Sequence, residues 1–78
     1  MNKLILKSAT QDKIIYLYQP EGKGTFGEIS IKTGDDEATV NLKSDADETG
    51  YYARKACSKI KEFIEKKNLS MNYTQAWY

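Results

Sequence analysis

The sequence predicts a single α+β domain, in which a four-stranded antiparallel meander packs on one C-terminal helix and a strand-like tail follows. Three observations predict this fold. Residues 26–43 alternate between apolar and polar side chains on both sides of a Gly-Asp turn, residues 46–67 change to a helical period, and residues 69–78 return to alternation. The length of 78 residues suits one domain, residues 1–78, with one modest core.

The first two strands are expected at residues 3–7 and 13–19. Residues 3–7 place three apolar side chains between two lysines, and a polar turn follows them. Residues 13–19 are β-branched or aromatic at nearly every position, which favours a strand that is covered on both faces. Pro20 ends this strand because proline has no amide N–H to donate to a sheet.

The most regular hairpin is expected at residues 26–32 and 38–43, joined by a turn at residues 33–36. In each strand, one face is formed by every second residue. These residues are Gly27, Ile29, Ile31, Ala38, Val40 and Leu42.

The helix is expected near residues 46–67, because apolar side chains recur there at helical spacing. They are Ala53, Ala56, Cys57, Ile60, Phe63 and Ile64. Asp45 and Glu48 have the spacing of an N-terminal capping box, and Asn68 suits a left-handed residue at the C-terminal end.

The tail carries the single tryptophan. Leu69, Met71, Tyr73 and Trp77 share one parity, as they would on one face of a strand. The tail either adds a strand to the sheet or lies across its second face. Trp77 then either closes a small core or protrudes as a contact residue for a partner.

The residue types present argue against an enzyme. Histidine is absent, which removes the commonest general base and metal ligand. Cys57 is the only cysteine and lies on the apolar stripe of the helix, so we interpret it as a core residue in a protein of a reducing compartment. We therefore predict no catalytic residues, no cofactor and no metal.

Two local motifs resemble loops that bind ligands in other proteins. Residues 22–27 read G-x-G-x-x-G and resemble the glycine-rich loop of protein kinases, but the segments that hold magnesium and substrate in that family are missing. We interpret them as a flexible hairpin loop, and whether this loop binds an anion stays open. Residues 45–50 resemble the first half of a calcium loop, yet Ala56 stands where the bidentate glutamate would be, which favours a capped helix start.

The six tyrosines leave two interpretations open. Tyr16, Tyr18 and Phe26, with nearby lysines, could stack nucleic-acid bases on a sheet face. Alternatively, these aromatic side chains and Tyr73 pack on the sheet with their hydroxyls at the rim. The net charge of +1, from twelve basic and eleven acidic residues, does not select a nucleic-acid or membrane partner.

Three segments resemble small uncharacterised bacterial proteins of about this length: residues 18–22, residues 27–31 and the terminal Ala76-Trp77-Tyr78. That group has no assigned activity, so the resemblance implies none.

We expect a cytoplasmic protein-interaction or regulatory module that binds an unidentified protein or a second copy of itself, with no membrane segment. A weak nucleic-acid-binding domain is the alternative. The expected partner-binding surface comprises Tyr16, Tyr18, Phe26, Tyr73, Trp77 and Tyr78.

Overall fold

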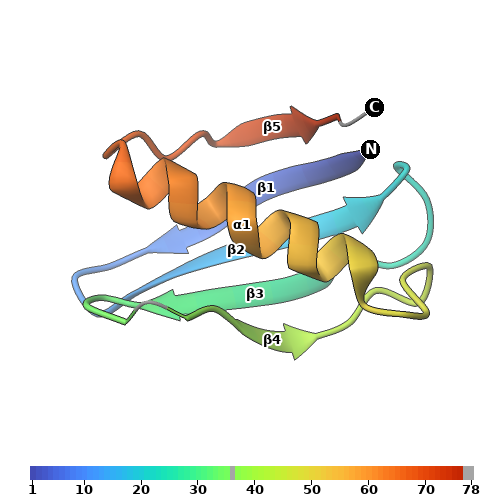
Figure 1. The fold of residues 1–78 in the computed structure, drawn as a ribbon, viewed down its shortest axis with the longest axis horizontal. Helices are drawn as coiled ribbons and strands as arrows, with labels where there is room; N and C mark the ends of the chain where they lie inside the picture. The colour runs from blue at the N-terminus through green and yellow to red at the C-terminus, as the bar shows by residue number, and fades with distance from the viewer. Residues whose placement is uncertain (36, 77–78) are drawn as a thin grey trace.

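Five strands form one antiparallel sheet, and one helix lies across it (Figure 1). The computed structural model describes residues 1–35 and 37–76. Its elements are β1 (Asn2–Ala9), β2 (Lys13–Pro20), β3 (Gly27–Lys32), β4 (Thr39–Leu42), α1 (Tyr51–Glu65) and β5 (Asn72–Gln75). The strand order β4-β3-β2-β1-β5 confirms the four-stranded meander and adds the tail as a fifth strand.

The C-terminal strand joins the sheet beside β1, so the alternative in which the tail crosses the second face is wrong for Asn72–Gln75. Leu4 in the middle of β1 has Tyr18 of β2 on one side and Tyr73 of β5 on the other. The helix makes this arrangement because it carries the chain back across the sheet from β4 to the opposite edge (Figure 1).

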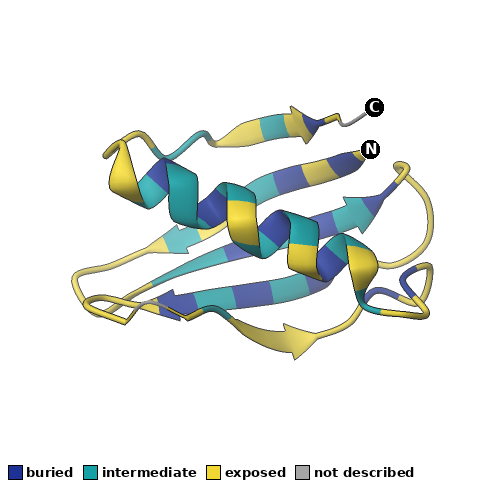
Figure 2. Ribbon diagram, in the orientation of Figure 1, coloured by how far each residue is buried: buried dark blue, intermediate teal, exposed yellow. Residues whose placement is uncertain are grey.

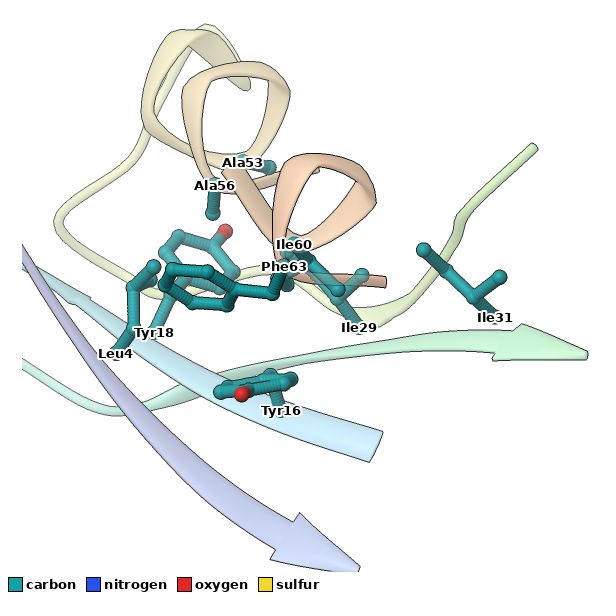
Figure 3. Packing of buried hydrophobic residues seen from close by; sticks show 9 residues of the cluster. All are labelled: Leu4, Tyr16, Tyr18, Ile29, Ile31, Ala53, Ala56, Ile60 and Phe63. Carbon is teal, nitrogen blue, oxygen red and sulfur yellow. The ribbon is translucent and has the colours of Figure 1, made fainter. Parts of the chain in front are cut away.

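The core lies between α1 and the face of the sheet that carries Leu4, Tyr16, Tyr18 and Ile29 (Figure 3). Helical residues spaced three or four apart, among them Ala53, Ala56, Ile60 and Phe63, meet these strand residues. Alternation in β3 is as expected, because Gly27, Ile29 and Ile31 are buried while the residues between them are half-buried (Figure 2). Small alanines at the start of the helix let it approach the large tyrosine rings.

Only one face of the sheet is covered by the described residues, so the expectation that β2 is covered on both faces is wrong. Tyr16 and Tyr18 point toward the helix and are fully buried, whereas Ile15 and Leu17 are half-buried on the opposite face. We refer to that opposite face as the outer face of the sheet.

The helix begins at Tyr51, five residues later than expected, and a different residue caps it. Gly50 occupies the N-cap in a left-handed conformation with φ 79°. The cap itself comes from Asp47, whose carboxylate accepts the amides of Tyr52 and Ala53 at 3.1 and 3.0 Å. The expected capping box of Asp45 with Glu48 is therefore wrong.

The helix ends in a Schellman motif, and the left-handed residue is Lys67 rather than Asn68. Lys67 has φ 54°, and its amide donates to the carbonyl of Ile64 at 3.1 Å. The amide of Asn68 donates to the carbonyl of Phe63 at 2.9 Å, which completes the motif. No helix within the described residues is long and apolar enough to cross a bilayer.

Candidate interaction surface

Two residues of the expected surface, Tyr16 and Tyr18, belong to the core instead. Both side chains have no solvent exposure, so assigning them to a partner-binding surface is wrong. The Tyr16 hydroxyl donates to the carbonyl of Ser70 at 2.6 Å. Burial raises the pKa of Tyr16, as expected for a phenol enclosed between helix and sheet.

The Tyr18 hydroxyl is held in a buried hydrogen-bond network at the start of the helix. It donates to Oδ2 of Asp47 at 2.8 Å and accepts the amide of Ser44 at 3.0 Å. Burial is the main cause that raises the pKa of Tyr18 to about 12, and the bond to Asp47 adds to it. The phenol therefore stays protonated at neutral pH and ties β2 to the segment that precedes α1.

Of the remaining residues of the expected surface, the structure describes Tyr73, which lies in β5, and Phe26, which directly precedes β3, and these strands are not neighbours in the sheet. Tyr73 is half-buried, with its ring edge-on to Phe63 at 5.2 Å between centroids, and the ammonium of Lys59 lies 5.2 Å from the Tyr73 centroid. Phe26 is half-buried directly before β3. Trp77 and Tyr78 lie outside the described residues.

The glycine-rich loop is filled by groups of the chain itself. The amide of Thr25 donates to Oδ1 of Asp45 at 2.8 Å, and the amide of Asp45 donates to the Thr25 hydroxyl at 3.0 Å. A Cβ on Gly24 would come within 2.4 Å of that same oxygen, and a Cβ on Gly27 within 2.1 Å of the Tyr18 ring. Close packing thus explains why positions 24 and 27 are glycines. The Asp45 carboxylate already accepts the Thr25 amide, which a bound anion would need as a donor.

The calcium-like motif is likewise part of the scaffold. Asp45 accepts from the glycine-rich loop, whereas the Asp47 oxygens accept from Tyr18 and the first turn of α1. Among the described residues, no group of three or more His, Cys, Asp and Glu side chains could hold a metal ion.

The most unusual feature of the described surface lies along β4, at the edge of the sheet opposite β5. This strand is outermost, and no described residue pairs with its free edge. All four of its residues are exposed, including Val40 at 42% and Leu42 at 59% (Figure 2). Exposed apolar side chains on an unpaired strand are a liability that folded proteins usually avoid.

An apolar groove runs between β4 and α1, because the helix packs on β1, β2 and β3 and leaves β4 beyond it (Figure 1). The groove has a volume of about 550 Å³. Its apolar lining comes from Ala38, Val40, Ala53 and Cys57, and its basic lining from Lys43, Arg54 and Lys61. We call this feature, together with the free edge of the strand, the β4 groove.

Cys57 lies in the β4 groove and is half-buried. Burial raises the pKa of its thiol, and the nearby ammonium of Lys61 only partly opposes that effect. A thiol with a raised pKa is a weak nucleophile at neutral pH. The placement agrees with a packing role on the rim of the core.

A polar network crosses the outer face. Lys7 of β1 donates to Oε1 of Glu28 at 2.7 Å, and the side-chain amide of Asn41 donates to Oε2 of Glu28 at 3.0 Å. Asn41 also bonds Ser30, which fixes the polar residues of β4 on this face. The bond from Lys7 is the main cause that holds the pKa of Glu28 below its usual value. Leu42 also lies on this face, because the register of β4 against β3 shifts by one residue and Leu42 pairs with Glu28.

Sequence alternation alone does not reveal the β4 groove. The pattern predicts that Ala38, Val40 and Leu42 share one face, which is wrong for Leu42. A one-residue shift of register in β4 pairs Val40 with Ile29 but Leu42 with Glu28, so Leu42 lies on the outer face.

Comparison of the chain with protein-family models, curated proteins and solved structures finds no match.

Proposed function

We propose that this chain is a small non-catalytic protein-interaction module that binds an extended strand along the β4 groove. One observation carries the proposal: β4 combines an unpaired backbone edge with exposed Val40, which lines an apolar groove, and with exposed Leu42 on the outer face. An added strand would satisfy the free backbone groups of β4, and its alternate side chains would fill the groove.

The opposite edge of the sheet supports the choice of β4. There, β5 exposes the polar Asn72 and Thr74 and turns Tyr73 inward against Phe63. A strand with polar exposed residues gains little by pairing, whereas burial of Val40 and Leu42 would add hydrophobic free energy. The strands at the two edges therefore differ in the polarity of their exposed residues, although Met71, directly before β5, is also exposed.

The chemistry available in the chain supports a non-catalytic role in the cytoplasm. Histidine is absent, and Cys57 has a raised pKa. A single cysteine also fits a reducing compartment. The nucleic-acid alternative loses its main support, because Tyr16 and Tyr18 are enclosed in the core and cannot stack on bases.

Site-specific photo-crosslinking in living cells tests the proposal. A photoreactive phenylalanine derivative replaces Val40 in one variant and Lys3, exposed on the outer face in β1, in the matched control. We expect a light-dependent protein adduct from position 40 and none from position 3. An adduct only from position 3, a nuclease-sensitive adduct, or no adduct from position 40 would each contradict the proposal.

A further inference from the structure

We propose that the extended strand bound in the β4 groove is acidic and sets a carboxylate against the cations of Lys43 and Arg54. Two consecutive apolar residues lie next to that carboxylate, one facing Val40 in the groove and one facing Leu42 on the outer face. This inference rests on the proposed function and names the chemistry of the partner at the same surface.

The charged side chains that line the β4 groove are all basic. They are Lys43, Arg54 and Lys61, and no carboxylate of the described residues lines the groove with them. None of the three forms an ion pair with a described residue, whereas Lys7 and Lys59 are each paired with a glutamate. The whole chain has a net charge of only +1, so this excess of positive charge is local. It favours a ligand of opposite charge.

Two of these cations are held at the same end of the groove. Nζ of Lys43 donates to the carbonyl of Glu48 at 2.9 Å, and the guanidinium of Arg54 donates to the carbonyl of Thr49 at 3.4 Å. The two carbonyls belong to consecutive residues, so the two cations lie near each other. A carboxylate bound between them would offset their mutual repulsion.

The charge is more balanced toward the other end of the groove. Lys61 lines the groove there and also lines a neighbouring hollow, to which Asp35 and Glu65 contribute. Two turns of α1 separate Lys61 from Arg54, roughly 10 Å along the helix axis. The acidic residue of the partner is therefore assigned to the end of the groove at Arg54.

The shift of register in β4 determines the order of the partner's residues. Val40 and Leu42 pair with consecutive residues of β3, so Asn41 is one extra residue in β4. A regular partner strand would likewise meet Val40 and Leu42 with two consecutive residues, which point to opposite faces. The residue after them points into the groove again, opposite Lys43. Read toward the C-terminal end of β4, the partner is therefore apolar, apolar and acidic.

Selection from a displayed library of random peptides tests the inference on the purified chain. We expect the wild-type chain to enrich peptides that contain two consecutive apolar residues followed or preceded directly by an acidic one. An enriched peptide should also form a light-dependent adduct with the variant that carries the photoreactive phenylalanine derivative at position 40. That adduct places the peptide on the β4 groove.

Charge reversal tests the role of the two cations. Lys43→Glu and Arg54→Glu are combined in one variant. Both side chains are exposed, and an acidic residue in the first turn of a helix is favourable, so the fold should be kept, which circular dichroism checks. Affinity for an enriched acidic peptide, measured by fluorescence anisotropy, should fall at least about tenfold in the double variant and about threefold in each single variant.

A second selection and a matched control complete the experiment. The double variant should enrich peptides with lysine or arginine in place of the acidic residue. Lys3→Glu combined with Lys23→Glu gives the same net charge at exposed positions outside β4 and α1, and should leave the affinity unchanged.

Three results would overturn the inference. They are enriched peptides without an acidic residue beside the apolar pair, an affinity for acidic peptides that the double variant keeps, and single-stranded DNA that displaces every enriched peptide from the wild-type chain. If a peptide still forms an adduct from position 40 in these cases, the proposed function stands and the chemistry named here is wrong. A library that yields no peptide crosslinked from position 40 contradicts both.

Discussion

Replacement of Asp47 by alanine should remove the main link between the sheet and the start of the helix. Asp47 is 1% exposed. It accepts the Tyr18 hydroxyl at 2.8 Å and the amides of Tyr52 and Ala53 at 3.1 and 3.0 Å. Alanine leaves all three donors without this acceptor.

The expected loss of stability follows from these bonds. Loss of a helix cap costs about 1–2 kcal/mol, and a buried hydroxyl without its acceptor costs about 1–2 kcal/mol more. A domain of this length has a free energy of unfolding of roughly 4–12 kcal/mol. A loss of about 3 kcal/mol is therefore a large share of the total, and the melting temperature should fall by about 12 °C or more.

Urea and thermal unfolding, followed by circular dichroism, measure the effect. The matched control is Asp45→Ala, because Asp45 is exposed and accepts the single amide of Thr25 through its side chain. The control should cost less than about 1 kcal/mol. If Asp47→Ala costs no more than the control, the network at the helix start does not hold the fold together as described.

Three further changes follow from single contacts, each measured by urea unfolding. Gly27→Ala should cost at least about 2 kcal/mol, because the new Cβ would lie 2.1 Å from the Tyr18 ring; a neutral result would contradict this packing. Lys67→Gly should stabilise the chain by about 1 kcal/mol, since residue 67 has φ 54°; a destabilised variant would contradict the left-handed helix end. The hydrogen bond from Lys7 lowers the pKa of Glu28, so ionised Glu28 stabilises the fold at neutral pH. This stabilisation is lost as the pH falls below 4.5, the ordinary pKa of a glutamate, and through the lowered pKa of Glu28. Glu28→Gln should therefore weaken the acid dependence of stability, and an unchanged pH profile would count against the ion pair.

The fold was predictable because most elements have one clear period. Alternation in Gly27–Lys32 and the apolar stripe of Tyr51–Glu65 each select one face without help from the rest of the chain. The boundaries of the helix were less predictable. Its start depends on Asp47 reaching the first turn from a preceding loop, and no local spacing shows which of two nearby aspartates does so.

The candidate surface was not predictable from composition. In β2, apolar residues occupy both faces, so the sequence alone does not say whether its tyrosines face solvent or the helix. Tyr18 faces the helix because Gly27 has no side chain and leaves room for the Tyr18 ring, and because the Asp47 carboxylate accepts the Tyr18 hydroxyl. Both residues belong to segments outside β2. Alternation around β4 also does not show the shift of register that turns Leu42 to the outer face.

Use of the β4 groove as the interaction surface is tested most directly by amide NMR spectra of the isotope-labelled chain, recorded with and without unlabelled lysate of its own host. Signals of Thr39–Leu42 and of Cys57 should change together when the lysate is added, while those of Lys3 and Thr74 stay constant. Constant β4 signals, or changes gathered on Lys3 and Thr74 instead, would contradict the assignment of the β4 groove as the surface on which this chain binds a partner.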